Sequence, residues 1–250
     1  MKMKTRNQIV MVLLALFVFA LMIKAVAAVP GGPNSITVEK SETGDLSNIG
    51  AKQINAEAGN VTQLTINASI LTTSWQGYYG NITGIITLID GSGNTMYDWT
   101  SGTSFSPVGE IYAGNSSVTS WSDVVCVNLN GDGVPGQDGV NATVLEDYYG
   151  MSSTDTDGIS ETFQGTNDIT IGTTTLNSCP ATNTYVNNAS QSTKFNETLL
   201  TENATGTVIF ATQVENDETG YDGSPWDFQM IVGENGAAGT TPYYFYVELV

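Results

Sequence analysis

The sequence predicts an all-β protein, built as a β-sandwich or a jelly-roll-like pair of antiparallel sheets with one short helix. Short runs of β-branched and aromatic residues recur from Val61 to the C-terminus, and Gly, Asn, Asp and Ser separate them. A helical pattern of apolar residues stands out only at 141–149. About ten short strands at this spacing, with almost no helix, favour two packed sheets.

The N-terminus predicts a secretory signal peptide that is cleaved after Ala27. Lys2, Lys4 and Arg6 precede the apolar run 9–23, and small residues follow it. The run is shorter than the about 20 residues that a membrane-spanning helix needs, although a retained anchor is the alternative. We therefore expect an extracellular or cell-surface protein, which lies on a membrane only if the leader is kept.

Three regions follow from this reading. Residues 1–27 are the signal peptide, and 28–60 form a loosely held arm that starts with a Pro/Gly turn and has one possible strand at 36–38. Residues 61–250 are predicted to form a single β-sandwich domain, because a chain of this length can bury one sizeable hydrophobic core.

Within the domain, Gly-rich residues 90–94 predict a hairpin connection. Asn141 is the candidate cap of the helix, whose Leu145 and Tyr148 or Tyr149 face inward. The apolar final strand is expected inside a sheet rather than at its edge. Strands are predicted at 61–66, 70–71, 82–89, 95–99, 109–112, 124–127, 184–186, 207–211, 227–232 and 243–250.

The charge of the mature chain limits its partners. Four of the seven basic residues lie in the leader, so the mature chain has a formal charge of 3 − 25 = −22. Nucleic acids are excluded as natural partners because their recognition depends on Lys and Arg. Cations and cationic surfaces would be attracted instead. The absence of His removes Ser-His-Asp and Cys-His catalysis and His-ligated zinc.

Cys126 and Cys179 are the only cysteines. In an exported protein such a pair predicts a disulfide, and two buried free thiols are the alternative. The bridge would stabilise the fold by about 4 kcal/mol in the chain-entropy model.

Sugar attachment is the most visible modification that the sequence suggests. Asn-x-Ser/Thr sequons mark surface positions in exported chains, although roughly half of them are expected by chance in a chain so rich in Asn, Ser and Thr. They occur at Asn60, Asn67, Asn81, Asn115, Asn141, Asn188, Asn196 and Asn203.

Residues 128–139 resemble a calcium-binding loop. Oxygen ligands would come from Asn128, Asn130, Asp132, the carbonyl of Val134 and Asp138. Asn replaces the usual first acid, and the closing acid stands one position early. Calcium is the only cofactor that we consider, and a simple Asn/Asp/Gly turn is the alternative.

Acidic turns and tryptophans suggest two weaker sites. The acids at 155–157, 215–218 and 222 could pair for glycosidic acid–base chemistry, but solvated loop acids are the simpler interpretation. Exposed rings bind sugars and quaternary ammonium groups, whereas rings beside strands more often pack in the core. The rings in question are Trp75, Tyr78, Tyr79, Trp99, Trp121 and Trp226.

Four stretches resemble uncharacterised exported cell-surface glycoproteins of archaea. They are residues 75–84 (WQGYYGNITG), 106–112 (SPVGEIY), 221–230 (YDGSPWDFQM) and 243–249 (YYFYVEL). The resemblance would cover about Gly59 to the C-terminus and implies a cell-surface setting. It carries over no activity and no catalytic residue.

The leading hypothesis is a non-enzymatic, N-glycosylated cell-surface or extracellular β-domain with a structural or interaction role. One version is a filament or envelope subunit, in which residues 36–38 add as a strand to another copy or to another envelope component. The alternative is a calcium-assisted adhesin or ligand-binding module. The third is a secreted hydrolase based on carboxylates.

Overall fold

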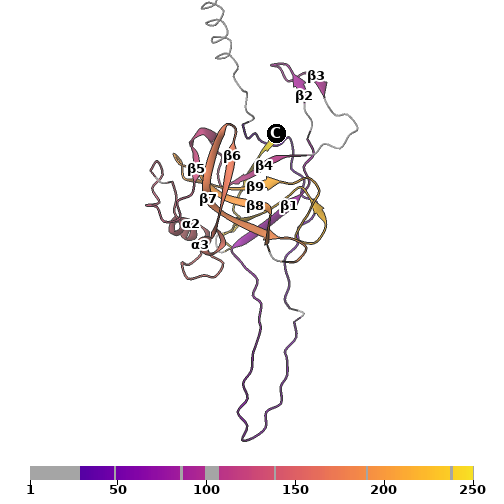
Figure 1. The fold of residues 1–250 in the computed structure, drawn as a ribbon, viewed down its shortest axis with the longest axis vertical. Coiled ribbons are helices and arrows are strands. Elements are labelled where there is room, and N and C mark those ends of the chain that lie inside the picture. The colour runs from indigo at the N-terminus through magenta and orange to yellow at the C-terminus, as the bar shows by residue number, and fades with distance from the viewer. Residues whose placement is uncertain are drawn as a thin grey trace, which may run out of the picture.

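The computed structural model describes residues 29–47, 49–84, 87–98, 107–137, 139–189, 191–236 and 239–249 (Figure 1). The predicted leader lies outside these residues. The helices are α2 (Ala142–Tyr149), α3 (Ile159–Thr162) and the 3₁₀ turn η1 (Trp121–Asp123). The strands are β1 (Trp75–Gly80), β2 (Thr87–Ile89), β3 (Thr95–Asp98), β4 (Gly109–Gly114), β5 (Val124–Cys126), β6 (Gly165–Ile171), β7 (Thr174–Tyr185), β8 (Gln191–Glu202), β9 (Thr207–Val214), β10 (Glu218–Thr219), β11 (Pro225–Trp226), β12 (Phe228–Gly233) and β13 (Tyr244–Leu249).

A seven-stranded antiparallel sheet forms the body of the molecule. Its strand order is β13-β4-β9-β8-β7-β6, and β5 also pairs with β8. Three further two-stranded pairs are β1–β12, β2–β3 and β10–β11. The all-β class predicted from the sequence is therefore confirmed.

The central strands are buried on both faces. Along β9, Val208 and Phe210 point into one apolar cluster, while Ile209 and Ala211 point into another on the opposite face. This alternation follows from the two-residue period of a strand. A strand buried on both sides needs an almost continuous apolar run, and residues 207–211 supply one.

The first core lies between the large sheet and a second layer. The β1–β12 pair packs over β8 and β9, and the helices α2 and α3 complete the cover. Met230 and Val232 of β12, Leu145 of α2 and Ile159 of α3 are almost completely buried there. The two layers give the sandwich-like arrangement that the sequence predicted.

The second core lies on the other face, where the sheet curls. Ile169 of β6, Tyr112 of β4 and Leu200 of β8 share one cluster although these strands are not neighbours. Just beyond β6, the backbone N–H of Gly172 donates to the Glu248 carboxylate of β13 at 2.8 Å. The two ends of the sheet thus approach each other.

Helix α2 is the short helix that the sequence predicted. The Asn141 side chain caps it by accepting from the backbone N–H of Val144 at 2.9 Å. Gly150 ends it in the left-handed region at φ 69°, which a residue without a Cβ adopts at little cost. Leu145 and Tyr149 face the core, as predicted, whereas Tyr148 is exposed.

The sequence reading missed β1, β6, most of β7 and all of β8. Strand β8 is central, yet it carries buried polar residues such as Glu197, Thr198 and Glu202. These interrupt the apolar alternation on which the prediction rested. Hydrogen bonds to neighbouring loops satisfy much of this polarity, as for Glu202, which accepts from the backbone N–H groups of Thr119 and Ser120.

Three predicted strands of the N-terminal region, at 36–38, 61–66 and 70–71, are not strands. Residues 36–38 and 61–72 are extended, exposed and outside every assigned strand. Residues 43–73, which we call the extended loop, leave the body on one side and return to it at β1 (Figure 1). The first assigned strand among the described residues is therefore β1, which begins at Trp75.

The position of the last strand also differs from the prediction. Strand β13 lies at the end of the sheet rather than inside it. Its outer edge is partly covered, because Gly31 exchanges two backbone hydrogen bonds with Val247, at 3.1 and 2.9 Å. Pro30 and Pro33 flank this bridge, and a proline without an N–H limits further pairing along the edge.

Among the residues described, no helix is long and apolar enough to cross a membrane.

The predicted disulfide joins Cys126 at the end of β5 to Cys179 in β7. Both strands use the same edge of β8, since β7 pairs with it as far as Thr198 and β5 pairs with it from Leu200 onward. The bridge holds the two strands together at the point where one replaces the other.

Replacing both cysteines by Ser should lower the free energy of unfolding by about 4 kcal/mol, because the bridge closes a loop with a sequence separation of 53. Urea denaturation of the two proteins, followed by tryptophan fluorescence, measures the difference. Equal midpoints for the two proteins would show that hydrogen bonding to β8 alone holds β5 and β7.

Candidate functional site

The predicted calcium loop follows β5. Its side-chain oxygens accept hydrogen bonds within tight turns of the loop. The Asn128 side chain accepts from the N–H of Asn130 at 3.3 Å, and the Asp132 side chain accepts from the N–H of Val134 at 2.9 Å. These are the turn contacts that Asn and Asp make in any such loop. Asp138 lies outside the described residues. Among the residues described, no three acidic or Cys side chains lie close enough to hold a metal ion.

A cleft lies between this loop and the beginning of β6. Its volume is about 400 Å³, and its walls include Cys126 and Pro180 beside the disulfide. Every residue that lines it is uncharged, although the chain has a formal net charge of −18. Its polar residues are Asn128, Asn130, Gln164, Thr166 and Ser178.

Two of the four tryptophans belong to the core. Trp75 packs against Phe163 and Phe210, with ring centroids 6.2 and 6.3 Å apart. Trp121 packs against Tyr112 and Tyr246 in the second cluster. For these two tryptophans the structure agrees with core packing, and Trp99 lies outside the described residues.

Trp226 belongs to a ring cluster near the surface. The ring of Tyr79 lies 4.9 Å from that of Trp226 and 5.0 Å from that of Tyr221. The indole N–H of Trp226 donates to Asp222 at 3.0 Å. A hydrogen bond to Tyr79, together with some burial, raises the pKa of Tyr221 to about 12. The rings meet edge to face, so each ring covers part of the face of its neighbour.

The predicted acidic turns hold the chain together. Asp157 accepts from the Thr72 hydroxyl at 2.6 Å through its side chain and from the Trp75 indole at 2.7 Å through its carbonyl. Asp155 accepts from the N–H of Ser152 at 2.7 Å. The two contacts of Asp157 fix the end of the extended loop where it enters β1.

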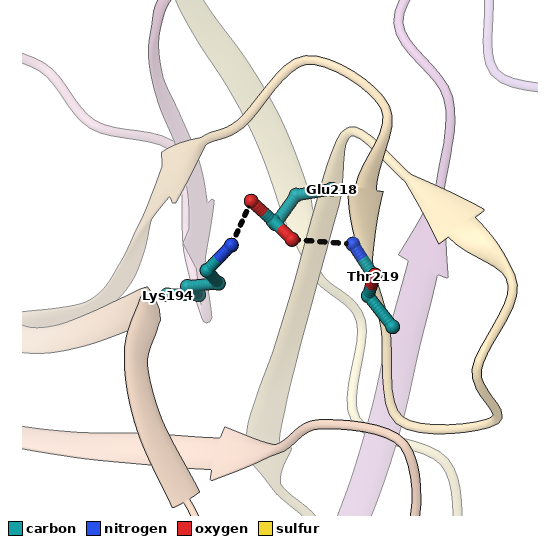
Figure 2. Close-up of polar contacts among 3 residues, drawn as sticks. All are labelled: Lys194, Glu218 and Thr219. Carbon is teal, nitrogen blue, oxygen red and sulfur yellow. Dashed lines mark hydrogen bonds and ion pairs between the residues drawn. The ribbon is translucent and has the colours of Figure 1, made fainter.

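Glu218, in another of these turns, forms an ion pair with Lys194 of β8 (Figure 2). Its other oxygen accepts from the N–H of Thr219 at 2.8 Å. The hydrogen bond from Lys194 is the main reason that the pKa of Glu218 lies below its ordinary value. Figure 2 shows this pair tying the β10 turn to β8, which is a structural role.

A pair of facing carboxylates lies where the sequence reading did not look. Glu110 of β4 and Glu248 of β13 are cross-strand partners on the curled face of the sheet. Glu248 accepts from the Tyr112 hydroxyl at 3.2 Å and from Gly172. Burial, reinforced by the negative charge of Glu248, raises the pKa of Glu110 to about 7. The signal in the sequence that could have revealed this pair is a glutamate at an inward position of an otherwise apolar strand.

A further acid is buried within the first core. Glu197 of β8 has no exposed surface, and one of its oxygens accepts from the N–H of Ile231 at 2.9 Å. Its other oxygen has no hydrogen-bond partner. Burial raises the pKa of this carboxyl well above its ordinary value. The acid lies between the two layers, away from the cleft.

The structure separates the eight sequons into two groups. The exposed asparagines are Asn60, Asn67, Asn81 and Asn188, and the partly buried ones are Asn115, Asn141, Asn196 and Asn203. Several of the second group use their side chains in the fold. The amide nitrogen of Asn141 donates to the carbonyl of Gly131 at 2.9 Å, and Asn115 accepts from the N–H of Val208 at 2.9 Å.

Part of the extended loop has the sequence of a strand but no sheet to join. In residues 61–72, which we call the donor segment, the apolar side chains of Leu64, Ile66, Ala68 and Ile70 alternate with polar ones. Ile66 is 81% exposed and Ile70 is 94% exposed. Residues 61–71 make no hydrogen bond to another described residue.

Comparison of the chain with known protein families, with curated proteins and with solved structures finds no match. The resemblance to exported archaeal glycoproteins stays a prediction, and function has to be argued from the molecule itself.

The Glu110–Glu248 pair predicts an unusual pH dependence of stability. The folded protein raises the pKa of Glu110 from 4.5 to about 7. The protonated carboxyl therefore makes its full contribution to the free energy of unfolding below pH 4.5, and this contribution is lost as the pH rises through 7. Glu110→Gln should therefore be about 2 kcal/mol more stable than wild type at pH 8 and equal to it near pH 4. Denaturant midpoints measured across this range test the prediction, with the exposed Glu39→Gln as the control. Parallel curves for wild type and Glu110→Gln would contradict it.

Proposed function

We propose that the protein is an exported, N-glycosylated cell-surface domain with a structural or interaction role. It joins a neighbouring molecule by strand addition, and the donor segment supplies the strand. This form of recognition uses main-chain hydrogen bonds for affinity and alternate side chains for specificity.

The observation that carries the proposal is the unpaired donor segment. A strand with one apolar face is stable only when it pairs with a sheet and buries that face. In this molecule the apolar positions of the segment are exposed to solvent, and its backbone groups have no partner among the described residues. Residues 36–38 are exposed too, but they span only three positions.

Charge also favours this segment as the point of contact. Residues 58–89 contain no charged side chain, in a mature chain with a formal charge of −22. Two such molecules repel each other over most of their surfaces. An uncharged segment on a loop that extends away from the body can reach a neighbour at a low electrostatic cost (Figure 1).

The other two functions have less support. The cleft beside the disulfide accommodates an uncharged ligand, but its aromatic residue, Phe163, is almost completely buried and offers no face for stacking. The acids Glu110 and Glu248 face each other, but neither lines this cleft. No feature of the described residues supports a substrate-binding site that includes these two acids.

Glycosylation fits the same setting, and Asn67 lies on the polar face of the donor segment. A glycan there would leave the apolar face free to pair. Attached sugars would also solvate a surface with few charges, and they would discourage unspecific association of the exposed apolar residues.

Peptide mapping of the protein from its native source should find sugar on Asn60, Asn67, Asn81 and Asn188. Asn141 should be unmodified, because its amide nitrogen bonds to the carbonyl of Gly131 and its oxygen caps α2. The same protein, after its sugars are removed enzymatically, serves as the control for the measured masses. Modified Asn141 together with bare exposed sequons would contradict this assignment.

Association of the mature chain should depend on the donor segment. Ile66→Asp should weaken self-association at least about tenfold, because it places a charge on the strand face that is buried on pairing. The same change at Ile54, which is also exposed in the extended loop, should leave association unchanged. Sedimentation across a range of concentrations measures both variants. A wild-type protein that is monomeric throughout, with no binding to envelope fractions, would overturn the proposal.

A further inference from the structure

We infer that the acceptor of the donor segment is the free edge of β1 in a second copy of this chain, an inference that rests on the proposed function. We call free the edge at which the backbone groups of Trp75, Gly77 and Tyr79 face away from β12. The donor segment of one molecule adds there as a third strand beside β1 and β12. Its apolar side chains then cover the open side of the first core.

One edge of β1 has no partner strand. Strand β1 pairs with β12 alone, and the backbone N–H of Glu234 donates to the carbonyl of Ser74 at 2.8 Å. Because hydrogen-bonded and non-hydrogen-bonded pairs alternate along an antiparallel ladder, every second residue after Ser74 bonds to β12. The residues between them, Trp75, Gly77 and Tyr79, direct their N–H and C=O groups away from it. Among the residues described, nothing bonds to these three N–H groups.

The middle of this edge is open to solvent. Gln76 and Gly77 are exposed, and a Cβ added to Gly77 would meet no neighbouring atom closer than 4.0 Å. The carbonyl of Gly77 accepts from the side chain of Gln76 at 2.7 Å, a surface contact that the N–H of an incoming strand can replace. Residues 34–45 of the N-terminal arm are exposed and make no hydrogen bond to β1.

Two other edges are already occupied. On the edge of β12 that faces away from β1, the Thr212 hydroxyl donates to the carbonyl of Gln229 at 3.0 Å. On the same edge, the N–H of Ile231 donates to the carboxyl of Glu197 at 2.9 Å. The outer edge of β13 in the large sheet is bridged to Gly31. A donor strand would have to displace these contacts, whereas the free edge of β1 offers unused N–H groups.

The first core is not closed on the side of this free edge. Tyr78 of β1 and Phe245 and Val247 of β13 pack against the core, yet all three are only partly buried. Strand β12 packs over β8 and β9, whereas the ring of Tyr78 lies 5.3 Å from that of Phe245. Strand β1 is thus displaced from β12 toward β13. A strand added beyond β1 would lie farther in this direction and cover these side chains.

The donor segment fits this edge in length, pattern and charge. Its apolar alternation runs from Leu64 to Ile70, while β1 has six residues, and neither stretch has a charged side chain. Side chains that lie opposite each other on paired strands point to the same face. We expect the register that places Ile66 on the core face with Tyr78, which leaves Asn67 and its glycan on the solvent face. A shift by one residue would expose the apolar side chains instead.

The fold opposes pairing of the two parts within one molecule. Because the donor segment directly precedes β1, such pairing would need a hairpin that reverses the chain just before the strand. The chain is held there in another course, since Asp157 accepts from the Thr72 hydroxyl and from the Trp75 indole. The donor segment leads away from the body instead (Figure 1). Pairing therefore needs a second copy.

The contact joins two different surfaces of the same chain. Each copy can give one strand through its donor segment and accept another at β1. Heterologous contacts of this kind make rings where the rotation closes and open filaments where it does not.

Cross-linking between separately prepared variants tests the acceptor. Protein with Ile66→Cys is mixed with protein carrying Gln76→Cys, and a short bismaleimide reagent is added without reductant, so that the native disulfide stays intact. We expect a cross-linked dimer of the two variants, at least about tenfold more abundant than in a mixture of Ile54→Cys with Gln76→Cys. Mass spectrometry of the joined peptides identifies the pair.

A proline in the acceptor separates strand pairing from mere proximity. Gly77→Pro, added to the Gln76→Cys protein, removes an N–H that faces away from β12, and proline is tolerated at such a position of an edge strand. We expect it to abolish the cross-link, whereas Gly77→Ala, which keeps the N–H, should preserve it. Urea denaturation verifies that both acceptors are folded. A folded Gly77→Pro acceptor that still gives the full yield would overturn the inference.

The other outcomes separate this inference from the proposed function. If Ile66→Cys joins Thr170→Cys of β6 and not Gln76→Cys, strand addition stands and β1 is not the acceptor. The inference is also wrong if Gln76→Cys joins Val38→Cys of the arm instead, or if a chain with both Ile66→Cys and Gln76→Cys closes on itself at a rate independent of protein concentration. If Ile66→Cys joins none of these sites and the protein stays monomeric, both proposals fail.

Discussion

The sharing of one edge of β8 by two strands is the constraint on which the rest of the structure depends. Strand β7 leaves β8 after Thr198, and β5 takes its place from Leu200. This exchange lets β7 turn away with β6, so that the sheet curls and encloses a second core. The disulfide between Cys126 and Cys179 holds the two strands at this point. The cleft of about 400 Å³ lies beside the same junction.

Hydrogen-bond donors, rather than cations, stabilise the buried acids. Residues 28–250 contain three lysines and no arginine, so few acids can form ion pairs. Asp227 accepts from the N–H groups of Ile82 and Asp217, and Glu202 accepts from Thr119, Ser120 and Thr205. These bonds tie loops to the sheet, and those to Glu202 outweigh its burial and keep its pKa below the ordinary value.

The sequence was most informative where one simple pattern decides the structure. The helix at 142–149, with its Asn cap, and the apolar strand β9 followed from periodicity, and the disulfide followed from the count of two cysteines. Strand β8 could not be recognised, because its buried polar residues are satisfied by loops that are distant in sequence. The Glu110–Glu248 pair depends on the register of β4 with β13, which no local pattern reveals. Strands were predicted at 61–66 and 70–71 because the pattern of apolar residues is that of a strand, but these residues join no sheet in the part of the chain that the structure describes.

The position of β1 has a mechanical consequence. The chain enters this strand from the extended loop and leaves it toward β2, and all six residues of the strand are paired with β12. A pulling force between those two exposed parts would run along the strand axis. The covalent backbone of the strand would then carry the load, and the hydrogen bonds with β12 would not have to bear it. Strand β1, which belongs to the layer that completes the first core, is thus also the element along which tension would pass.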